Sequence, residues 1–313
     1  LPACPLMHGT GAFTSFSGMS SAGCVVTLES RHFEPEELLD AVQRHEVNVL
    51  AIVGDAFGKP ILRALDAHPG EWDLSSVIAV ISSGVMWSEE TKQGLLKHHP
   101  GMLLADQFSS SEALGMGSSV SSASGTSHTA KFRLGENAIV LSEDGTRIEP
   151  GSGEVGMVAV KGRTPIGYYK DPEKTARTFK VIDGERYSVP GDYATVEADG
   201  TLKLLGRGSV CINTGGEKVF PEEVEEVLKT HASIRDAVAV GVPDEKWGEA
   251  IVAVVEATPG ATVDEADVVS HVKAHLASFK APKRVVVVDT IGRAPNGKVD
   301  YKRLRDDAVR SLA

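Results

Sequence analysis

The chain has 313 residues, a net charge of −11 and 42% hydrophobic residues, which suits a globular protein with room for two domains. The acidic excess argues against a nucleic-acid surface, because neutralising phosphates needs clustered lysine and arginine. Cys4, Cys24 and Cys211 are odd in number and far apart, which argues against a disulfide framework or zinc cluster and favours a reducing, cytoplasmic setting. No run reaches the ~20 apolar residues of a membrane span.

Short apolar runs alternate with helical patterns over residues 1–128, and this alternation predicts parallel βαβ units. The expected strands are 1–7, 23–28, 47–53, 76–81 and 102–108, and the expected helices are 12–21, 35–46, 55–67 and 88–99. Ligands of such sheets bind beyond the carboxyl ends of the strands. We therefore expect the site to be formed by loops 7–11, 54–55, 82–88 and 107–112.

The pattern then changes twice. Residues 118–128 are rich in serine and glycine and predict a flexible loop, and residues 129–205 predict a small antiparallel β-barrel or sheet with Asp-Gly turns. Residues 206–313 predict a compact α+β domain whose first helix begins at Pro221. The fold class is thus α/β, with a partial parallel βαβ part (1–128), a small antiparallel barrel (129–205) and a small C-terminal α+β domain (206–313).

Four polar residues occupy positions that suit a nucleotide. Glu112 follows serine hydroxyls at a strand end, Asp192 adjoins a glycine turn, Arg207 could pair with a phosphate, and Lys298 ends a Pro-Asn-Gly-Lys turn. Each also has an ordinary interpretation, respectively an exposed loop carboxylate, a turn aspartate, a surface ion pair and a solvated lysine. The chain contains no G-x-x-x-x-G-K-[ST], H-E-x-x-H or G-x-S-x-G motif.

Seven segments in order resemble the motifs of the adenylate-forming superfamily, which includes acyl-CoA synthetases, firefly luciferase and nonribosomal adenylation domains. They are 5–9, 82–86, 108–112, 153–175, 191–192, 206–225 and 295–298. The chain departs from the family pattern at Ser83 and Met86, which replace Gly and Pro, and at Pro190, which replaces Thr. Segment 108–112 carries three replacements but keeps Glu112.

The resemblance implies that Lys298 and Glu112 are catalytic. Lys298 would stabilise negative charge between the attacking carboxylate and the α-phosphate, and Glu112 would bind Mg²⁺. Asp192 and Arg207 would hold the ribose. The other implied nucleotide-binding residues are Ser82, Ser83, Gly84, Asp106, Gln107, Phe108 and Ser111.

The resemblance also implies an acyl pocket and a domain rotation. The pocket would be formed by His8, Gly9, Val85 and Trp87. A mobile C-terminal domain would rotate about Gly208 and Ser209, although the family usually has Asp or Lys where Ser209 stands. After rotation, Gly215 and Gly216 would line the tunnel for the CoA pantetheine arm.

The implied function is ATP-dependent activation of a carboxylic acid to an acyl-adenylate, followed by thioester formation with CoA. The cofactors would be ATP, Mg²⁺ and CoA, and residues 84–87 resemble actinobacterial ligases for fatty or steroid-side-chain acids. The family's loop for the β- and γ-phosphates would precede Leu1, which starts within an apparent strand, so we expect a fragment that is inactive alone. Two alternatives are an amino-acid-activating domain and a non-catalytic adenylate- or partner-binding fragment. No motif indicates the oligomeric state.

Overall fold

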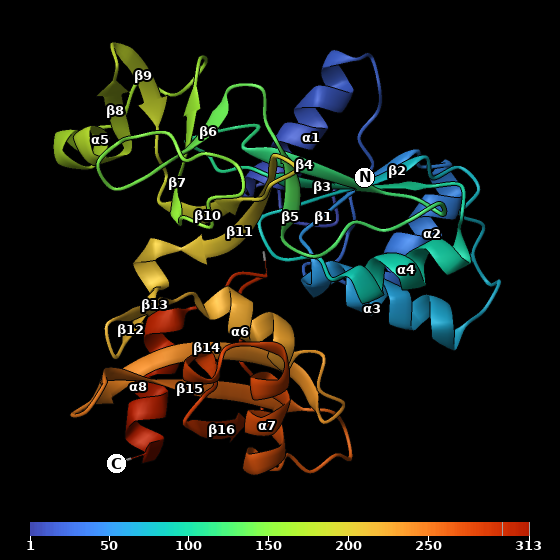
Figure 1. Cartoon of the computed structure of the whole chain (residues 1–313). Coiled ribbons are helices and arrows are strands. Elements are labelled where there is room, and N and C mark those ends of the chain that lie inside the picture. The colour runs from blue at the N-terminus through green and yellow to red at the C-terminus, as the bar shows by residue number, and fades with distance from the viewer. Residues whose placement is uncertain (296, 313) are drawn as a thin grey trace. The chain divides into compact units, whose positions relative to one another are not determined.

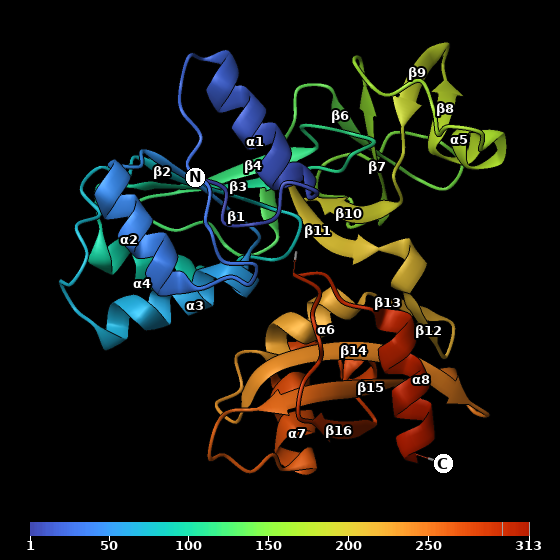
Figure 2. The ribbon, with the colours of Figure 1, turned by 180° about the vertical axis from the view of Figure 1, so that it is seen from behind.

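The computed structural model describes residues 1–295 and 297–312, which form two compact units. Unit 1 comprises Leu1–Pro190, Ala194–Leu204 and Ala294–Lys298, and unit 2 comprises Gly191–Tyr193, Leu205–Arg293 and Val299–Ala313. The ribbon with its element labels is drawn in Figure 1 and from behind in Figure 2. The predicted division at 128/129 and 205/206 remains a proposal.

The first part of unit 1 is a parallel sheet with helices, as the alternating pattern predicts. Its strands are β1 (Val49–Ile52), β2 (Ala79–Ser83) and β3 (Leu103–Phe108), and its helices are α1 (Gly9–Ser20), α2 (Pro35–His45), α3 (Asp55–Ala67) and α4 (Glu89–His98). Residues 1–3 run beside β1 through two backbone hydrogen bonds to Ala51. The strand predicted at 23–28 is wrong, because those residues adopt no regular structure.

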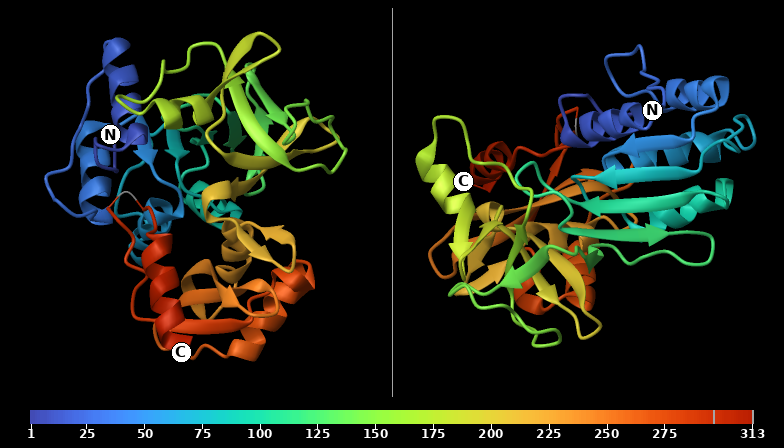
Figure 3. Two further views of the ribbon diagram at one scale, coloured as in Figure 1. Left: turned by 90° about the vertical axis from the view of Figure 1, so that its left-hand side faces the viewer. Right: turned by 90° about the horizontal axis from the view of Figure 1, so that it is seen from above.

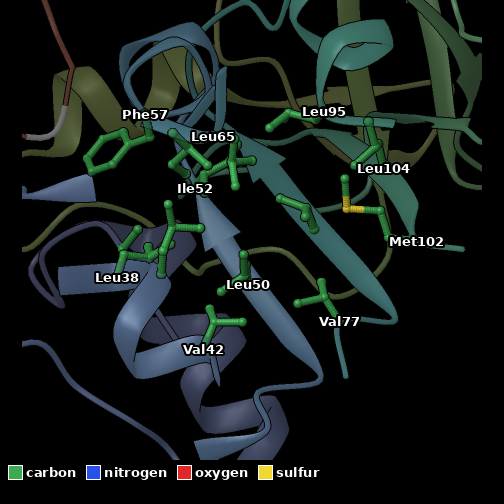
Figure 4. Close-up of a cluster of buried hydrophobic side chains, with 14 of the residues drawn as sticks. Leu38, Val42, Leu50, Ile52, Phe57, Leu65, Val77, Leu95, Met102 and Leu104 are labelled. Carbon is green, nitrogen blue, oxygen red and sulfur yellow. The ribbon is translucent and has the colours of Figure 1, made fainter. Parts of the chain in front are cut away.

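A hydrophobic cluster fixes α2, α3 and α4 against the parallel strands. Figure 4 shows residues of this cluster, among them Leu38 and Val42 of α2, Phe57 of α3, and Leu50 and Ile52 of β1. Alternate residues of β1 face this cluster, as the period of two in a strand requires. The packing places the carboxyl ends of the three strands at one edge of unit 1.

The remaining strands continue the same sheet in antiparallel fashion, and the last two of them include residues of unit 2. They are β4 (Gly117–Ser121), β5 (Lys131–Leu134), β6 (Ala138–Leu141), β7 (Gly156–Lys161), β8 (Phe179–Ile182), β9 (Glu185–Ser188), β10 (Asp192–Val196) and β11 (Thr201–Arg207), with α5 (Pro172–Thr178) between β7 and β8. The order is β1-β2-β3-β4-β5-β11-β10-β7-β9-β8, with β6 paired to β7. The right-hand view of Figure 3 shows the blue-to-green strands side by side.

The mixed α/β fold class is confirmed, with one correction. The predicted barrel is an open extension of the parallel sheet over the residues described, because β4 pairs with β3 and β5 pairs with β11. The flexible loop predicted at 118–128 is wrong in its first part, since residues 118–121 belong to β4. Serine side chains there are compatible with a strand because the backbone pairs on both sides, with β3 and β5.

Unit 2 contains a second, five-stranded sheet covered on both faces. Its elements are β12 (Ile212–Thr214), β13 (Glu217–Val219), α6 (Pro221–Leu228), β14 (Ile234–Asp244), β15 (Gly248–Ala257), α7 (Glu265–His275), β16 (Arg284–Val288) and α8 (Tyr301–Leu312), with 3₁₀ turns at Gly208–Val210 and Ser278–Lys280. In β14, Ala237 and Ala239 face the cluster that includes α6 and α7, while Val238 and Val240 face α8. Among the described helices, none is long and apolar enough to cross a membrane.

Candidate functional site

A tight loop after β2 packs on the end of β1 in unit 1. The N–H of Gly54 donates to the Ser82 hydroxyl at 2.9 Å, and the N–H of Asp55 donates to the Met86 carbonyl at 3.0 Å. Gly54 has φ +51°, and a Cβ there would lie 2.4 Å from that carbonyl oxygen, so only glycine fits. The loop after β2 is therefore fixed by its contacts with the backbone of Gly54 and Asp55, which follow β1.

His8 and Lys298 lie together at this edge. His8 caps α1, its Nδ1 accepts the Thr10 N–H at 3.3 Å, and a Cβ on Gly84 would lie 3.0 Å from its ring. Partial burial, with the charge of Lys298 second, lowers the pKa of His8. Its imidazole is therefore mainly neutral near pH 7, because the ordinary value is already about 6.5.

The turn that carries Lys298 packs on the same loop. Gly297 is buried, and a Cβ on it would meet Ala56 at 2.9 Å and both Val53 and Val85 at 3.6 Å. Lys298 itself is exposed. The structure thus brings together four predicted residues, His8, Gly84, Val85 and Lys298, in unit 1.

Other predicted residues are buried in ways that serve the fold. The side chains of Ser82, Trp87 and Phe108 are buried, and Trp87 packs on Gly58 with no exposed surface. Any contact of Ser82 or Phe108 with a nucleotide would have to come from the backbone, and the burial of Trp87 does not support its predicted place in a pocket wall. Ser83 is half-buried, its carbonyl accepts the Thr10 hydroxyl at 3.3 Å, and Gly9 begins α1.

Asp106 belongs to a buried ion pair. Its Oδ2 lies 3.4 Å from the ammonium of Lys92 on α4, and their side chains are 8% and 1% exposed. Burial raises the pKa of Asp106 to about 6, and the opposite charge of Lys92 limits the rise. The implied nucleotide contact of Asp106 therefore competes with a structural partner that the sequence did not reveal.

A turn after β3 presents the predicted Mg²⁺ ligand. The N–H of Ala113 donates to the Ser110 hydroxyl at 3.1 Å, which closes the turn, while Ser111 is exposed and Gln107 half-buried. The hydroxyl of Tyr168 donates to Glu112 Oε1 at 2.5 Å. The ammonium of Lys174 lies 3.9 Å from the centre of the Tyr168 ring.

A single carboxylate such as Glu112 is compatible only with a magnesium ion that phosphates also hold. Among the residues described, no group of three His, Cys, Asp or Glu could hold a metal ion. Mg²⁺ is usually bound by one or two carboxylates together with substrate phosphates. Glu112, a carboxylate on a turn with an exposed neighbour, would suit that arrangement.

In unit 2, Asp192 and Arg207 lie next to each other at the ends of β10 and β11. Arg207 Nε donates to Asp192 Oδ1 at 3.3 Å, and the Asp192 side chain is 7% exposed while that of Arg207 is 53% exposed. The structure therefore pairs the two residues for which the resemblance implies ribose binding.

Glu222 completes this corner, and its role was missed from the sequence. Its Oε1 accepts the N–H of Arg207 at 3.3 Å, while its buried Oε2 has no hydrogen-bond partner among the described residues. Burial, then the charges of Glu225 and Asp192, raise the pKa of Glu222 to about 7. Gly206 has φ +144°, and a Cβ there would lie 2.1 Å from Glu222 Oε2. The sequence indicated Glu222 only as one of the carboxylates that follow Pro221 at the start of a predicted helix.

The predicted hinge and tunnel residues also belong to unit 2. Gly208 and Ser209 form a 3₁₀ turn with Val210, and a Cβ on Gly208 would lie 2.5 Å from the Tyr193 ring. Gly215 and Gly216 are exposed at the turn between β12 and β13, and both have positive φ. Their roles in rotation and in CoA binding remain predictions.

Known proteins resemble nearly the whole chain. The family described as AMP-binding enzyme C-terminal domain matches residues 223–298. A medium/long-chain-fatty-acid and 3-oxocholest-4-en-26-oate CoA ligase of Mycolicibacterium smegmatis is 42% identical over 310 residues, which are 97% of this chain and 56% of the relative. The chain is therefore similar, over nearly its whole length, to a curated CoA ligase. A 3-oxocholest-4-en-26-oate CoA ligase of Rhodococcus rhodochrous is 43% identical, with the same shares covered.

The fold of the chain is also seen in a solved structure. ATP-bound MatB from Rhodopseudomonas palustris matches with a TM-score of 0.83 and 25% identity over 100% of this chain and 60% of that one. The chain thus spans about half the length of the curated relatives it matches. Tyr168 and Glu222 make contacts that the motifs alone did not indicate.

Proposed function

We propose that the whole protein is an ATP-dependent acyl-CoA ligase that activates a fatty or steroid-side-chain acid as its adenylate and transfers the acyl group to CoA. The observation that carries the proposal is the packing of the Lys298 turn beside His8 at the ends of the parallel strands. The named fatty-acid and steroid-acid ligases supply the substrate class. Cys4, Cys24 and Cys211 are all free thiols, which supports a reducing, cytoplasmic location.

Each residue at this edge has a task that its environment suits. Lys298, exposed on a turn whose Gly297 is buried, supplies positive charge where the acid and the α-phosphate would meet. His8 stays neutral and can line the acyl pocket without attracting an unwanted counter-charge. Glu112 would hold Mg²⁺, which when bound neutralises phosphate charge, and Asp192 with Arg207 would hold the ribose.

The substrate class is tested with the full-length protein and a series of carboxylic acids of graded size. We expect CoA-thioester formation with medium-chain, long-chain and steroid-side-chain acids, dependent on ATP and Mg²⁺. Activity confined to amino or aryl acids would contradict the substrate class. Nucleotide binding without thioester formation from any acid would favour a non-catalytic role.

Tyr168→Phe is expected to weaken the binding of Mg²⁺ that adenylation requires. The phenol is a hydrogen-bond donor to the carboxylate that would bind the ion, and loss of such an outer contact typically costs 10–100-fold in metal affinity. We expect about a tenfold increase in the Mg²⁺ concentration for half-maximal pyrophosphate exchange.

The matched control is Tyr169→Phe, because Tyr169 is the next residue and is 88% exposed. Its Mg²⁺ titration should match that of the unmodified protein. Equal curves for both variants would show that Tyr168 does not orient Glu112.

A further inference from the structure

The turn that carries Lys298 begins and ends on side chains that are anchored in the core of unit 2. Arg293 directly precedes residues 294–298, and Tyr301 follows them at the start of α8. Both side chains bond to acidic partners on other elements of the unit. None of the seven motifs assigns a role to either residue.

Arg293 anchors the incoming side of the turn. Its Nε donates to Asp236 Oδ2 at 2.6 Å and its Nη2 donates to Asp236 Oδ1 at 2.8 Å, so the guanidinium is held by two bonds. Asp236 lies where β14 shifts register against β15. Burial opposes ionisation of Asp236, but the hydrogen bonds of Arg293 and the charges of Lys229 and Arg293 hold its pKa below the usual range.

The backbone next to Arg293 is tied down as well. The N–H of Ile291 donates to Glu256 Oε1 at 2.5 Å, and the guanidinium of Arg303 donates to the Ile291 carbonyl. Ile291 is fully buried in the cluster that contains Leu304 of α8. The segment entering the turn therefore has little freedom to move.

Tyr301 anchors the outgoing side. Its hydroxyl donates to Glu225 Oε1 at 2.9 Å, and the same oxygen accepts the N–H of Ala239 at 3.1 Å. Burial, then the charge of Glu225, raises the pKa of Tyr301, so the phenol keeps its proton and remains a donor. Glu225 on α6 thereby joins the start of α8 to β14.

We propose that Arg293 and Tyr301 are positioning residues that hold the two ends of the turn that carries Lys298 and so limit where the lysine can go. The inference rests on the proposed function for its consequence in catalysis. Neither residue needs to touch substrate, because each acts through the backbone of the turn. A displacement of about 1 Å in a reacting group can cost 10²-fold in rate.

The test compares Arg293→Lys and Tyr301→Phe in the full-length protein. Arg293→Lys keeps the charge but loses the two-pronged bond, and Tyr301→Phe removes only a hydroxyl. Arg284→Lys is the control, since Arg284 forms an exposed ion pair with Glu265 at 3.2 Å, away from the turn. Two half-reactions are measured, pyrophosphate exchange for adenylation and thioester formation from a synthetic acyl-adenylate.

We expect the kcat of exchange to fall about tenfold in both variants, less than for loss of the lysine itself, while thioester formation stays within about twofold. Equal loss in both half-reactions, or no loss in either, would overturn the inference, because a purely structural role would not select one step. The Arg284→Lys control should leave both unchanged.

An NMR titration of His8 gives a readout that does not depend on activity. The charge of Lys298 contributes to lowering the pKa of His8, so displacement of the lysine should raise that pKa in both variants. An unchanged His8 titration would contradict the inference even if exchange fell. If the unmodified protein catalyses no exchange with any acid, the proposed function fails and the His8 titration still decides the positioning role.

Discussion

Lys298→Ala is expected to lower pyrophosphate exchange by about 10²–10³-fold, which corresponds to roughly 3–4 kcal/mol of transition-state stabilisation. The lysine is the group that we assign to the negative charge formed between the acid and the α-phosphate. Thioester formation from a supplied acyl-adenylate should fall much less, because that step does not form the same charge. The measurement is the ratio of the two half-reactions in the full-length protein.

Lys302→Ala is a suitable control, since Lys302 is exposed on α8 only a few residues away. The His8 pKa should rise in Lys298→Ala and stay the same in Lys302→Ala, although burial will keep it below the ordinary value. Exchange that is undiminished in Lys298→Ala would remove the lysine from the mechanism.

Lys92→Met is expected to destabilise unit 1 by roughly 3–5 kcal/mol at neutral pH, because it leaves the buried Asp106 charge without its partner. The effect should depend on pH in a defined direction. The folded-state pKa of Asp106 is already raised to about 6, so its ionisation in the folded protein lowers stability as the pH rises from about 4 through 6. Without Lys92 the pKa rises further, and the loss of stability should be larger at pH 7.5 than at pH 5.

Denaturant unfolding at these two pH values measures the effect. Lys97→Met is the matched control on the same helix, since Lys97 is exposed, and it should change the free energy of unfolding by less than about 0.5 kcal/mol. The double variant Lys92→Met/Asp106→Asn should recover part of the loss, because it removes the unpaired charge. A loss in Lys92→Met that is the same at both pH values would show that packing, not charge, dominates.

Local patterns predicted the elements whose periodicity is strong. The alternation of apolar runs and helices predicted β1, β2, β3 and the helices between them. Ser88, where the helix 88–99 was predicted to begin, is the N-cap of α4, and its hydroxyl accepts the N–H of Thr91. The same reasoning failed for β4, since a strand made of Gly, Ser and Val acquires its conformation from pairing with β3 and β5.

Site residues that lie in a sequence motif at a turn could be predicted. Residues that take part only through tertiary contacts could not. His8, Gly84 and Lys298 were named from their motifs, and they lie together in unit 1. By contrast, Lys92 reads in the sequence as an ordinary helix lysine, although it is among the most buried large side chains. Likewise, the sequence did not indicate the contact between Tyr168 and Glu112, because the two residues are 56 positions apart.

The grouping of residues 294–298 with unit 1 has a consequence for synthesis on the ribosome. Chains emerge from the N-terminus and domains generally fold as units during translation. The buried clusters of unit 1 draw their described residues from positions up to Leu204, so this core can form well before Lys298 is made. A chain that stops shortly before residue 298 would therefore keep the residues of these buried clusters but lack the lysine that we assign to adenylation.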